Sequence, residues 1–175
     1  KSEELLAGRN RLINFFKAQL AGIPIYTIVL LIKREIIMKT GMFLPGMLLA
    51  QDLDLWYRIA YRWPEIGYIC EPLAIYHMDI PGSNTRRYPC AERTCALVQR
   101  HLELSGKNGC LEDYKPCAIA MVRAWIRGSL FNEHIYETPR VVHLFKDMLS
   151  PQYRFVIRLF TLFPKGTLTV LQAIS

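Results

Sequence analysis

Apolar and polar residues follow one another with changing spacing along this chain of 175 residues. Residues 5–20 place apolar side chains at helical intervals, so we expect an amphipathic helix there. Residues 25–32 form a β-branched apolar run, which predicts a buried strand. Residues 34–40 predict a short helix that ends at Gly41, because glycine readily adopts the left-handed conformation of a helix C-cap.

The next segment alternates loops with short elements. Residues 42–50 contain Pro and Gly and predict a loop. Apolar residues at helical spacing predict a helix over residues 52–63, which Pro64 ends. Two short strand-like pieces follow at residues 67–70 and 73–76.

Beyond a turn at residues 81–84 the pattern is helical only. Residues 91–104 and 116–130 predict two long helices. Thr138-Pro139 and Ser150-Pro151 each place a hydroxyl residue before proline, which predicts the N-caps of two more helices. We therefore expect an α/β region over residues 1–88 and a helical region over residues 89–175.

Composition narrows the class of protein. Apolar residues make up 51% of the chain and charged residues 21%, which excludes a disordered or low-complexity chain. Five cysteines are too few for a disulfide scaffold, and their odd number favours a reducing compartment. The chain starts at Lys1 with neither Met nor a signal-peptide pattern, so we expect it to begin inside a longer protein.

Positive charge is concentrated toward the end of the chain. Residues 1–114 carry 14 basic and 12 acidic side chains, whereas residues 115–175 carry 8 basic and 3 acidic ones. This asymmetry predicts an anionic partner for the helical region, with an ordinary solvated helix face as the alternative.

The segment most suggestive of chemistry is Gln51-Asp52-Leu53-Asp54, at the junction of a loop and a helix. A helix N-terminus favours anionic side chains, and one carboxylate could act as a general base toward a substrate hydroxyl. The alternative is that an Asp at this position only caps the helix.

The order of short motifs around this segment resembles the second half of a family 2 glycosyltransferase of the GT-A fold. Five matches occur in the expected order over about 60 residues of the chain. They are Ile23-Pro24-Ile25 with Lys33-Arg34-Glu35 (R-R-E), Gly41-Met42-Phe43 (G-x-F), Asp52-Leu53-Asp54-Leu55-Trp56-Tyr57-Arg58 (D-x-D-L-W-x-R), Gly67-Tyr68-Ile69 (G-Y-I) and Glu71-Pro72-Leu73-Ala74-Ile75-Tyr76 (E-P-L-A-x-Y). The resemblance implies the C-terminal part of a GT-A (Rossmann-like) domain, followed by an all-helical tail.

The resemblance also implies a reaction. Asp52 stands where the family has its catalytic base, which deprotonates an acceptor hydroxyl as that oxygen attacks a sugar with inversion. The donor would be a nucleoside diphosphate sugar, and the acceptor a glycan or lipid-linked molecule of polysaccharide biosynthesis in the cell envelope. The expected substrate-binding residues are Asp54, Trp56, Arg58, Tyr76, Arg86 and Arg87.

Some of these assignments have plainer alternatives. Trp56 could stack on a sugar ring, but its place on an amphipathic helix favours core packing. Arg86 and Arg87 could bracket a diphosphate, or could be solvated loop residues.

The family uses a divalent cation, Mn²⁺ or Mg²⁺. We expect it to be bound mainly by the nucleotide-binding half, which would precede Lys1. The metal-binding D-x-D should follow a strand, whereas Asp52 and Asp54 open a helix. Where the family often has Y-R-x-H, this chain has Tyr76-His77-Met78-Asp79, so His77 and Asp79 are weak candidates for metal ligands.

Two departures from the family pattern leave another function open. Gln51 replaces the usual Glu, and Leu44 replaces the Asp that normally follows G-x-F. The alternative is a non-catalytic, glycosyltransferase-like module that binds membrane or a protein partner through its basic helical tail.

The last apolar segment, residues 153–163, is a candidate membrane contact. Its only charges are Arg154 and Arg158, which suits a helix lying on an anionic leaflet, with packing on the domain as the alternative. We expect a cytoplasmic protein, peripheral on the inner face of the cell membrane. Nucleic acid is not an expected partner, because the basic residues are interleaved with apolar ones and no reading helix is present.

Overall fold

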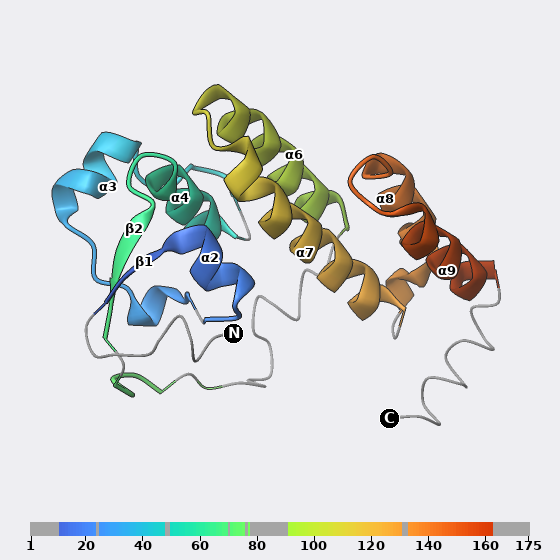
Figure 1. Ribbon diagram of the computed structural model, residues 1–175, viewed down its shortest axis with the longest axis horizontal. Coiled ribbons are helices and arrows are strands. Elements are labelled where there is room, and N and C mark those ends of the chain that lie inside the picture. Colours follow the sequence, from blue (N-terminus) through green and yellow to red (C-terminus); the bar gives the residue numbers. More distant parts are fainter. Residues whose placement is uncertain are drawn as a thin grey trace. The chain divides into compact units, whose positions relative to one another are not determined.

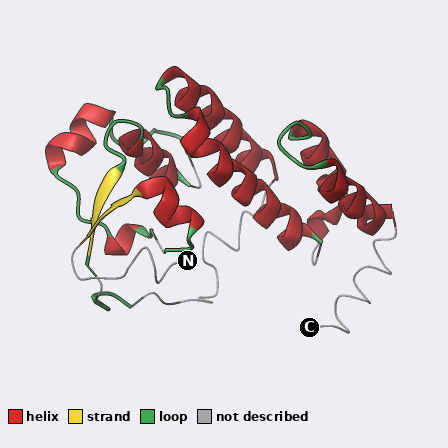
Figure 2. Cartoon of the chain, viewed as in Figure 1, coloured by secondary structure: helices red, strands yellow, loops and turns green. Residues whose placement is uncertain are grey.

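The computed structural model describes residues 11–23, 25–47, 50–69, 71–75, 77, 91–130 and 133–162. Within these residues the chain is mainly helical and carries one small sheet of two antiparallel strands (Figure 1, Figure 2). The expected mixture of helices and strands is therefore present, with helices dominant.

The chain divides into two compact units. The first unit comprises residues 1–89 and 100–117, and the second comprises residues 90–99 and 118–175. The elements of the first unit are β1 (Arg11–Asn14), α2 (Phe15–Leu20), the 3-10 turn η1 (Thr27–Val29), α3 (Arg34–Thr40), α4 (Gln51–Ala60) and β2 (Glu65–Tyr68). The second unit contains η2 (Glu133–Glu137), α8 (Thr138–Leu144) and α9 (Pro151–Leu162), while α6 (Ala91–Lys107) and α7 (Leu111–Ser129) contribute to both units.

The helix expected over residues 5–20 is confirmed over α2, but it is wrong over residues 11–14, which form strand β1. This strand pairs antiparallel with β2, with Ile13 opposite Ile66. Asn14 then caps α2, and its side-chain oxygen accepts a hydrogen bond from the Lys17 N–H at 3.1 Å. Pairing with a strand distant in sequence overrides the local helical spacing. Residues 5–10 lie outside the described residues.

The buried strand expected over residues 25–32 is also wrong. The run contains only η1, and its apolar side chains Ile28, Val29 and Leu31 are exposed. A strand needs a neighbour for its backbone hydrogen bonds, and the described sheet has only β1 and β2. The strand expected over residues 73–76 is also wrong over its described residues, because residues 73–75 form no regular element.

The predictions for α3 and α4 are confirmed. Helix α3 ends at Gly41, whose φ of 88° is left-handed. Helix α4 begins one residue earlier than expected and ends at Ala60, and a turn leads to Pro64. The carbonyl of Pro64 accepts a hydrogen bond from the Phe15 N–H at 2.7 Å, which ties the start of α2 to the chain just before β2.

Aromatic residues form the centre of the first unit. Phe15 and Phe16 from α2 meet Tyr57 from α4, and Tyr57 meets Tyr114 from α7 with ring centroids 4.9 Å apart. These rings are all buried. Their contacts hold α2, α4 and the beginning of α7 together, and such aromatic pairs add about 1 kcal/mol each beyond area burial.

Helices of the second unit start close to where the sequence predicted. The N-cap role of Ser150 is confirmed, because its Oγ accepts a hydrogen bond from the Tyr153 N–H at 3.2 Å. Thr138 is the first residue of α8 rather than its cap, and its buried hydroxyl lies 2.7 Å from that of Ser129. A buried hydroxyl needs a partner, so this pairing explains why Thr138 faces inward.

Gly41→Ala should lower the free energy of unfolding by about 1 kcal/mol, because alanine is strained in the left-handed conformation. Gly106→Ala is the matched control. Gly106 lies within α6, with nothing within 4 Å of the added Cβ, so alanine there should stabilise by about 0.5 kcal/mol. Urea unfolding measures both changes. If both substitutions shift the free energy of unfolding in the same direction, the left-handed conformation of Gly41 does not have the expected effect.

Candidate functional site

Two carboxylates in the first turn of α4 lie in different environments. Asp52 is partly exposed, whereas Asp54 is completely buried, with 0% exposure. Residues two positions apart on a helix point in nearly opposite directions, about 200° apart around its axis. The two side chains therefore belong to different surroundings although they are neighbours in sequence.

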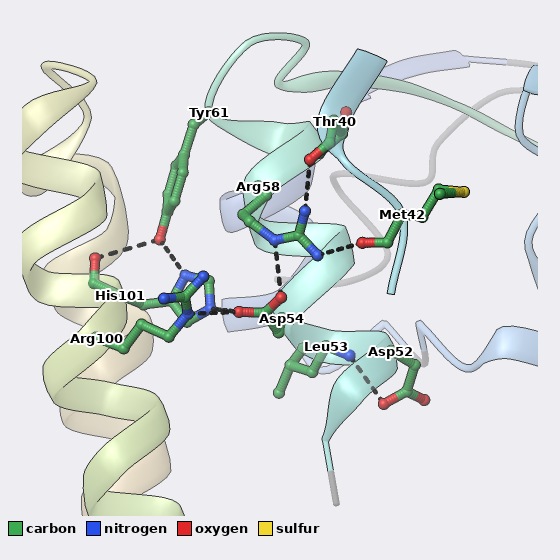
Figure 3. Close-up of polar contacts among 9 residues, drawn as sticks. All are labelled: Thr40, Met42, Asp52, Leu53, Asp54, Arg58, Tyr61, Arg100 and His101. Atoms are coloured by element: carbon green, nitrogen blue, oxygen red, sulfur yellow. Dashed lines mark hydrogen bonds and ion pairs between the residues drawn. The ribbon is translucent and has the colours of Figure 1, made fainter. Parts of the chain in front are cut away.

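Asp54 accepts hydrogen bonds from three cationic or polar side chains. Arg58 Nε donates to Oδ2 at 2.7 Å, and Arg100 Nε donates to Oδ1 at 2.9 Å. His101 Nε2 lies 3.0 Å from the same Oδ1. Figure 3 shows the carboxylate of Asp54 between the side chains from α4 and those from α6.

These contacts determine the ionisation of Asp54. Burial by itself raises its pKa, but the hydrogen bonds from His101, Arg100 and Arg58 and the charge of Arg58 outweigh burial. The pKa of Asp54 is therefore held well below its ordinary value. Asp54 is an anion at neutral pH and a poor proton acceptor.

The same network extends to Tyr61. An ionised Asp54 only accepts hydrogen bonds, so Nε2 of His101 carries the proton that bonds it. The other ring nitrogen, Nδ1, lies 2.9 Å from the Tyr61 hydroxyl. Burial raises the pKa of Tyr61 well above its ordinary value, so its phenol stays neutral and can donate to Nδ1 or to the backbone carbonyl of His101, 3.3 Å away. The chain from Tyr61 through His101 to Asp54 is thus consistently hydrogen-bonded.

Arg58 connects Asp54 to the loop that follows α3. Its Nη1 donates to the carbonyl of Thr40 at 2.5 Å, and its Nη2 donates to the carbonyl of Met42 at 2.6 Å. Carbonyls at a helix C-terminus lack partners within the helix, and Arg58 provides them here. Met42 has a φ of 56°, which is uncommon for a residue with a side chain. The guanidinium thus holds the start of this loop in a specific conformation.

Asp52 lies apart from the Asp54 cluster, at the beginning of α4 (Figure 3). Its Oδ2 accepts a hydrogen bond from Thr27 Oγ1 at 3.0 Å, and its Oδ1 accepts one from the Leu53 N–H at 2.8 Å. Each carboxylate oxygen can accept a further hydrogen bond. Asp52 is therefore an oriented, partly exposed carboxylate that retains capacity to accept hydrogen bonds.

Trp56 lies one turn after Asp52, on the same face of α4. It is 5% exposed, and its ring meets that of Phe43 edge-on at 6.2 Å. The interpretation of Trp56 as a core residue is supported, whereas Phe43 presents an exposed ring beside it. Within the described part of the chain, Nε1 of Trp56 is buried without a hydrogen-bond partner.

The remaining residues expected to bind substrate or metal differ in whether the structure describes them. Tyr76, Asp79, Arg86 and Arg87 lie outside the described residues, and their expected roles stay predictions. His77 is described and exposed. Among the described residues no group of three or more His, Cys, Asp or Glu side chains could hold a metal ion.

The sequence did not identify three residues that define this site. Thr27 lies in the run that predicts a strand over residues 25–32. Arg100 and His101 lie more than 40 positions after Asp54. His101 could have been noticed in the sequence, because it is a polar residue on the apolar face of the helix predicted over residues 91–104. For Thr27 no local signal existed, because its contact depends on how the loop folds.

Comparison with known proteins finds no family model, no curated protein and no solved structure that matches this chain. The interpretation of the site therefore depends on its residues. They define a partly exposed, oriented carboxylate at a helix N-terminus and a buried carboxylate that anchors the adjoining loop.

Asp54→Asn should lower the free energy of unfolding at pH 7 by about 3 kcal/mol, because it leaves the buried Arg58 without its counter-charge. Because the pKa of Asp54 is lower in the folded chain than in the unfolded chain, the ionised carboxylate stabilises the fold. This contribution is complete above the unfolded pKa of about 3.9 and is lost as the pH falls from there toward the folded pKa. The difference in the free energy of unfolding between the wild type and the variant, measured with urea, should therefore be smaller at pH 3 than at pH 6.

Asp52→Asn is the matched control for that experiment. It removes a partly exposed carboxylate from the same helix turn and should cost about 0.5 kcal/mol through the helix dipole. Equal losses for the two variants, or a difference independent of pH, would contradict the buried-anion assignment.

Proposed function

We propose that this chain is the acceptor-side part of an inverting glycosyltransferase of the GT-A type. It would transfer a sugar from a nucleoside diphosphate sugar to a hydroxyl of a glycan or lipid-linked acceptor. The observation that carries the proposal is the contrast between Asp54, buried and fully engaged, and Asp52, partly exposed and oriented by Thr27. This contrast agrees with the position that the motif order assigns to the base.

In the proposed reaction Asp52 accepts the proton of the acceptor hydroxyl. The hydroxyl oxygen attacks the anomeric carbon as the bond from that carbon to the diphosphate oxygen breaks. A nucleoside diphosphate leaves, and the new glycosidic bond has inverted configuration. The hydrogen bonds from Thr27 and the Leu53 N–H orient the carboxylate for this proton transfer.

Asp54 supports this reaction as a positioning residue. Its side chain is completely buried, and it acts through Arg58, which holds the carbonyls of Thr40 and Met42. Phe43 follows directly, with its ring exposed next to Trp56. An exposed aromatic ring in contact with the helix that carries the base suits the apolar face of an acceptor sugar. Phe43 would provide that face, with Trp56 packed beneath it.

The donor would be bound by a part of the protein beyond the described residues. The exposed apolar side chains Ile28, Val29 and Leu31 support this proposal, because a run of this kind normally packs against a neighbouring layer. We assign this run to the contact with the donor-binding part. The same run matches the family's strand before R-R-E in sequence, although here it forms only η1.

Asp52→Asn should lower kcat for sugar transfer by a factor of about 100 to 10,000, the usual contribution of a positioned base. The assay uses the protein as its own cell makes it, a panel of nucleoside diphosphate sugars and lipid-linked acceptors from the same cell. Release of nucleoside diphosphate measures the rate, and NMR of the product reports the anomeric configuration.

Glu112→Gln, which changes an exposed carboxylate in the first turn of α7, is the control and should leave kcat unchanged. Full transfer by folded Asp52→Asn would reject the base assignment. No transfer by the wild type with any donor would favour the non-catalytic, glycosyltransferase-like module, for which Gln51 is the supporting feature.

The native protein should have an intact mass above the 20.3 kDa of this chain, because the proposal places a nucleotide-binding half upstream of Lys1. Mass spectrometry and N-terminal sequencing of protein from its own cell test this. A native mass of 20.3 kDa would contradict the proposed nucleotide-binding half and, with it, the proposed sugar transfer.

A further inference from the structure

Helix α9 has two apolar faces, and only one of them is covered. Ile157 is 5% exposed and fixes the inner face. Phe155, Leu159 and Leu162 are 64%, 47% and 59% exposed. Their spacing of i, i+4 and i+7 places them in one stripe along the outer face of the helix.

The inner face of α9 is held by contacts within the second unit. Tyr153 lies one turn before Ile157, and the guanidinium of Arg123 from α7 stacks over the Tyr153 ring at 5.0 Å. Helices α8 and α9 also lie side by side (Figure 1). The rotation of α9 about its axis is therefore set by packing, so the outer stripe is exposed in the folded protein.

The charged residues of α9 itself have one sign. Arg158 is exposed and lies at the edge of the stripe, between Phe155 and Leu162 along the helix. Helix α9 contains no acidic residue, and residues 115–175 carry 8 basic against 3 acidic side chains. The surface that covers the stripe should therefore combine an apolar layer with negative charge.

We propose that the outer face of α9 lies in the interface of an anionic phospholipid leaflet. Phe155, Leu159 and Leu162 would enter the boundary between headgroups and acyl chains, while the long side chain of Arg158 reaches back to the phosphates. The 12 residues of α9 suit a helix that lies along the surface, since crossing requires about 20. No helix in the described part of the chain has the length and apolar character to cross a membrane.

A second copy of the chain is the alternative cover, and charge disfavours it. A two-fold contact between outer faces would bring Arg158 close to its equivalent in the other copy. With no acidic residue in α9, neither guanidinium would find a counter-charge on the facing helix. Anionic headgroups supply that charge, which is why we commit to the lipid surface.

Vesicle sedimentation tests the inference with the full chain. Binding should be strong to vesicles of three parts phosphatidylcholine and one part phosphatidylglycerol, weak to phosphatidylcholine alone, and reduced by salt. Leu159→Gln should lower the partition coefficient about tenfold. Arg158→Gln should lower it about fivefold on anionic vesicles only, and Arg158→Lys should restore it.

Leu144→Gln on α8 is the matched control, because Leu144 is also exposed but lies outside the stripe. It should bind vesicles like the wild type. Equal binding to both vesicle types, no binding, or equal losses for the two Leu→Gln variants would overturn the proposal. Self-association in sedimentation equilibrium that Leu159→Gln abolishes would overturn it in favour of a second copy. None of these outcomes depends on sugar transfer, so this inference and the proposed function can fail separately.

Discussion

The first unit depends on the burial of one charge. Asp54 has no exposure to solvent, and an anion in that position is tolerated only with full hydrogen bonding. Its partners come from α4 itself, through Arg58, and from α6, through Arg100 and His101. Arg58 in turn holds the end of α3. These contacts fix the three segments in relation to one another within the unit. Separating α6 from α4 removes two of the hydrogen bonds to Asp54, and separating α3 leaves Nη1 of Arg58 without the Thr40 carbonyl.

This constraint also divides the roles of the two carboxylates. A helix of 3.6 residues per turn directs positions i and i+2 to nearly opposite sides, so the side chain of Asp52 does not enter the cluster around Asp54. Asp52 lies in the first turn of α4, where it is partly exposed and accepts a hydrogen bond from Thr27. The buried structural carboxylate and the proposed base therefore lie two positions apart in the same helix turn.

Elements with local signals could be predicted from the sequence. Gly41 and Pro64 determine where α3 and α4 end, and Ser150 where α9 begins. Residues 11–14 and 25–32 could not, because strand formation depends on a partner distant in sequence. The site divides in the same way: Asp52 follows from motif order, but the burial of Asp54 depends on Arg100, 46 positions later.

The alternatives for residues 153–163 were packing or a membrane surface, and α9 shows why they are compatible. A helix with one apolar face packs against one apolar surface. Helix α9 has apolar residues on two faces, so it can contact two such surfaces. Ile157 is used for packing, which leaves Phe155 and Leu159 outside. Burial of the first face determines which residues form the second. The exposed stripe is therefore a consequence of the fold, and its basic edge specifies the sign of the surface that could cover it.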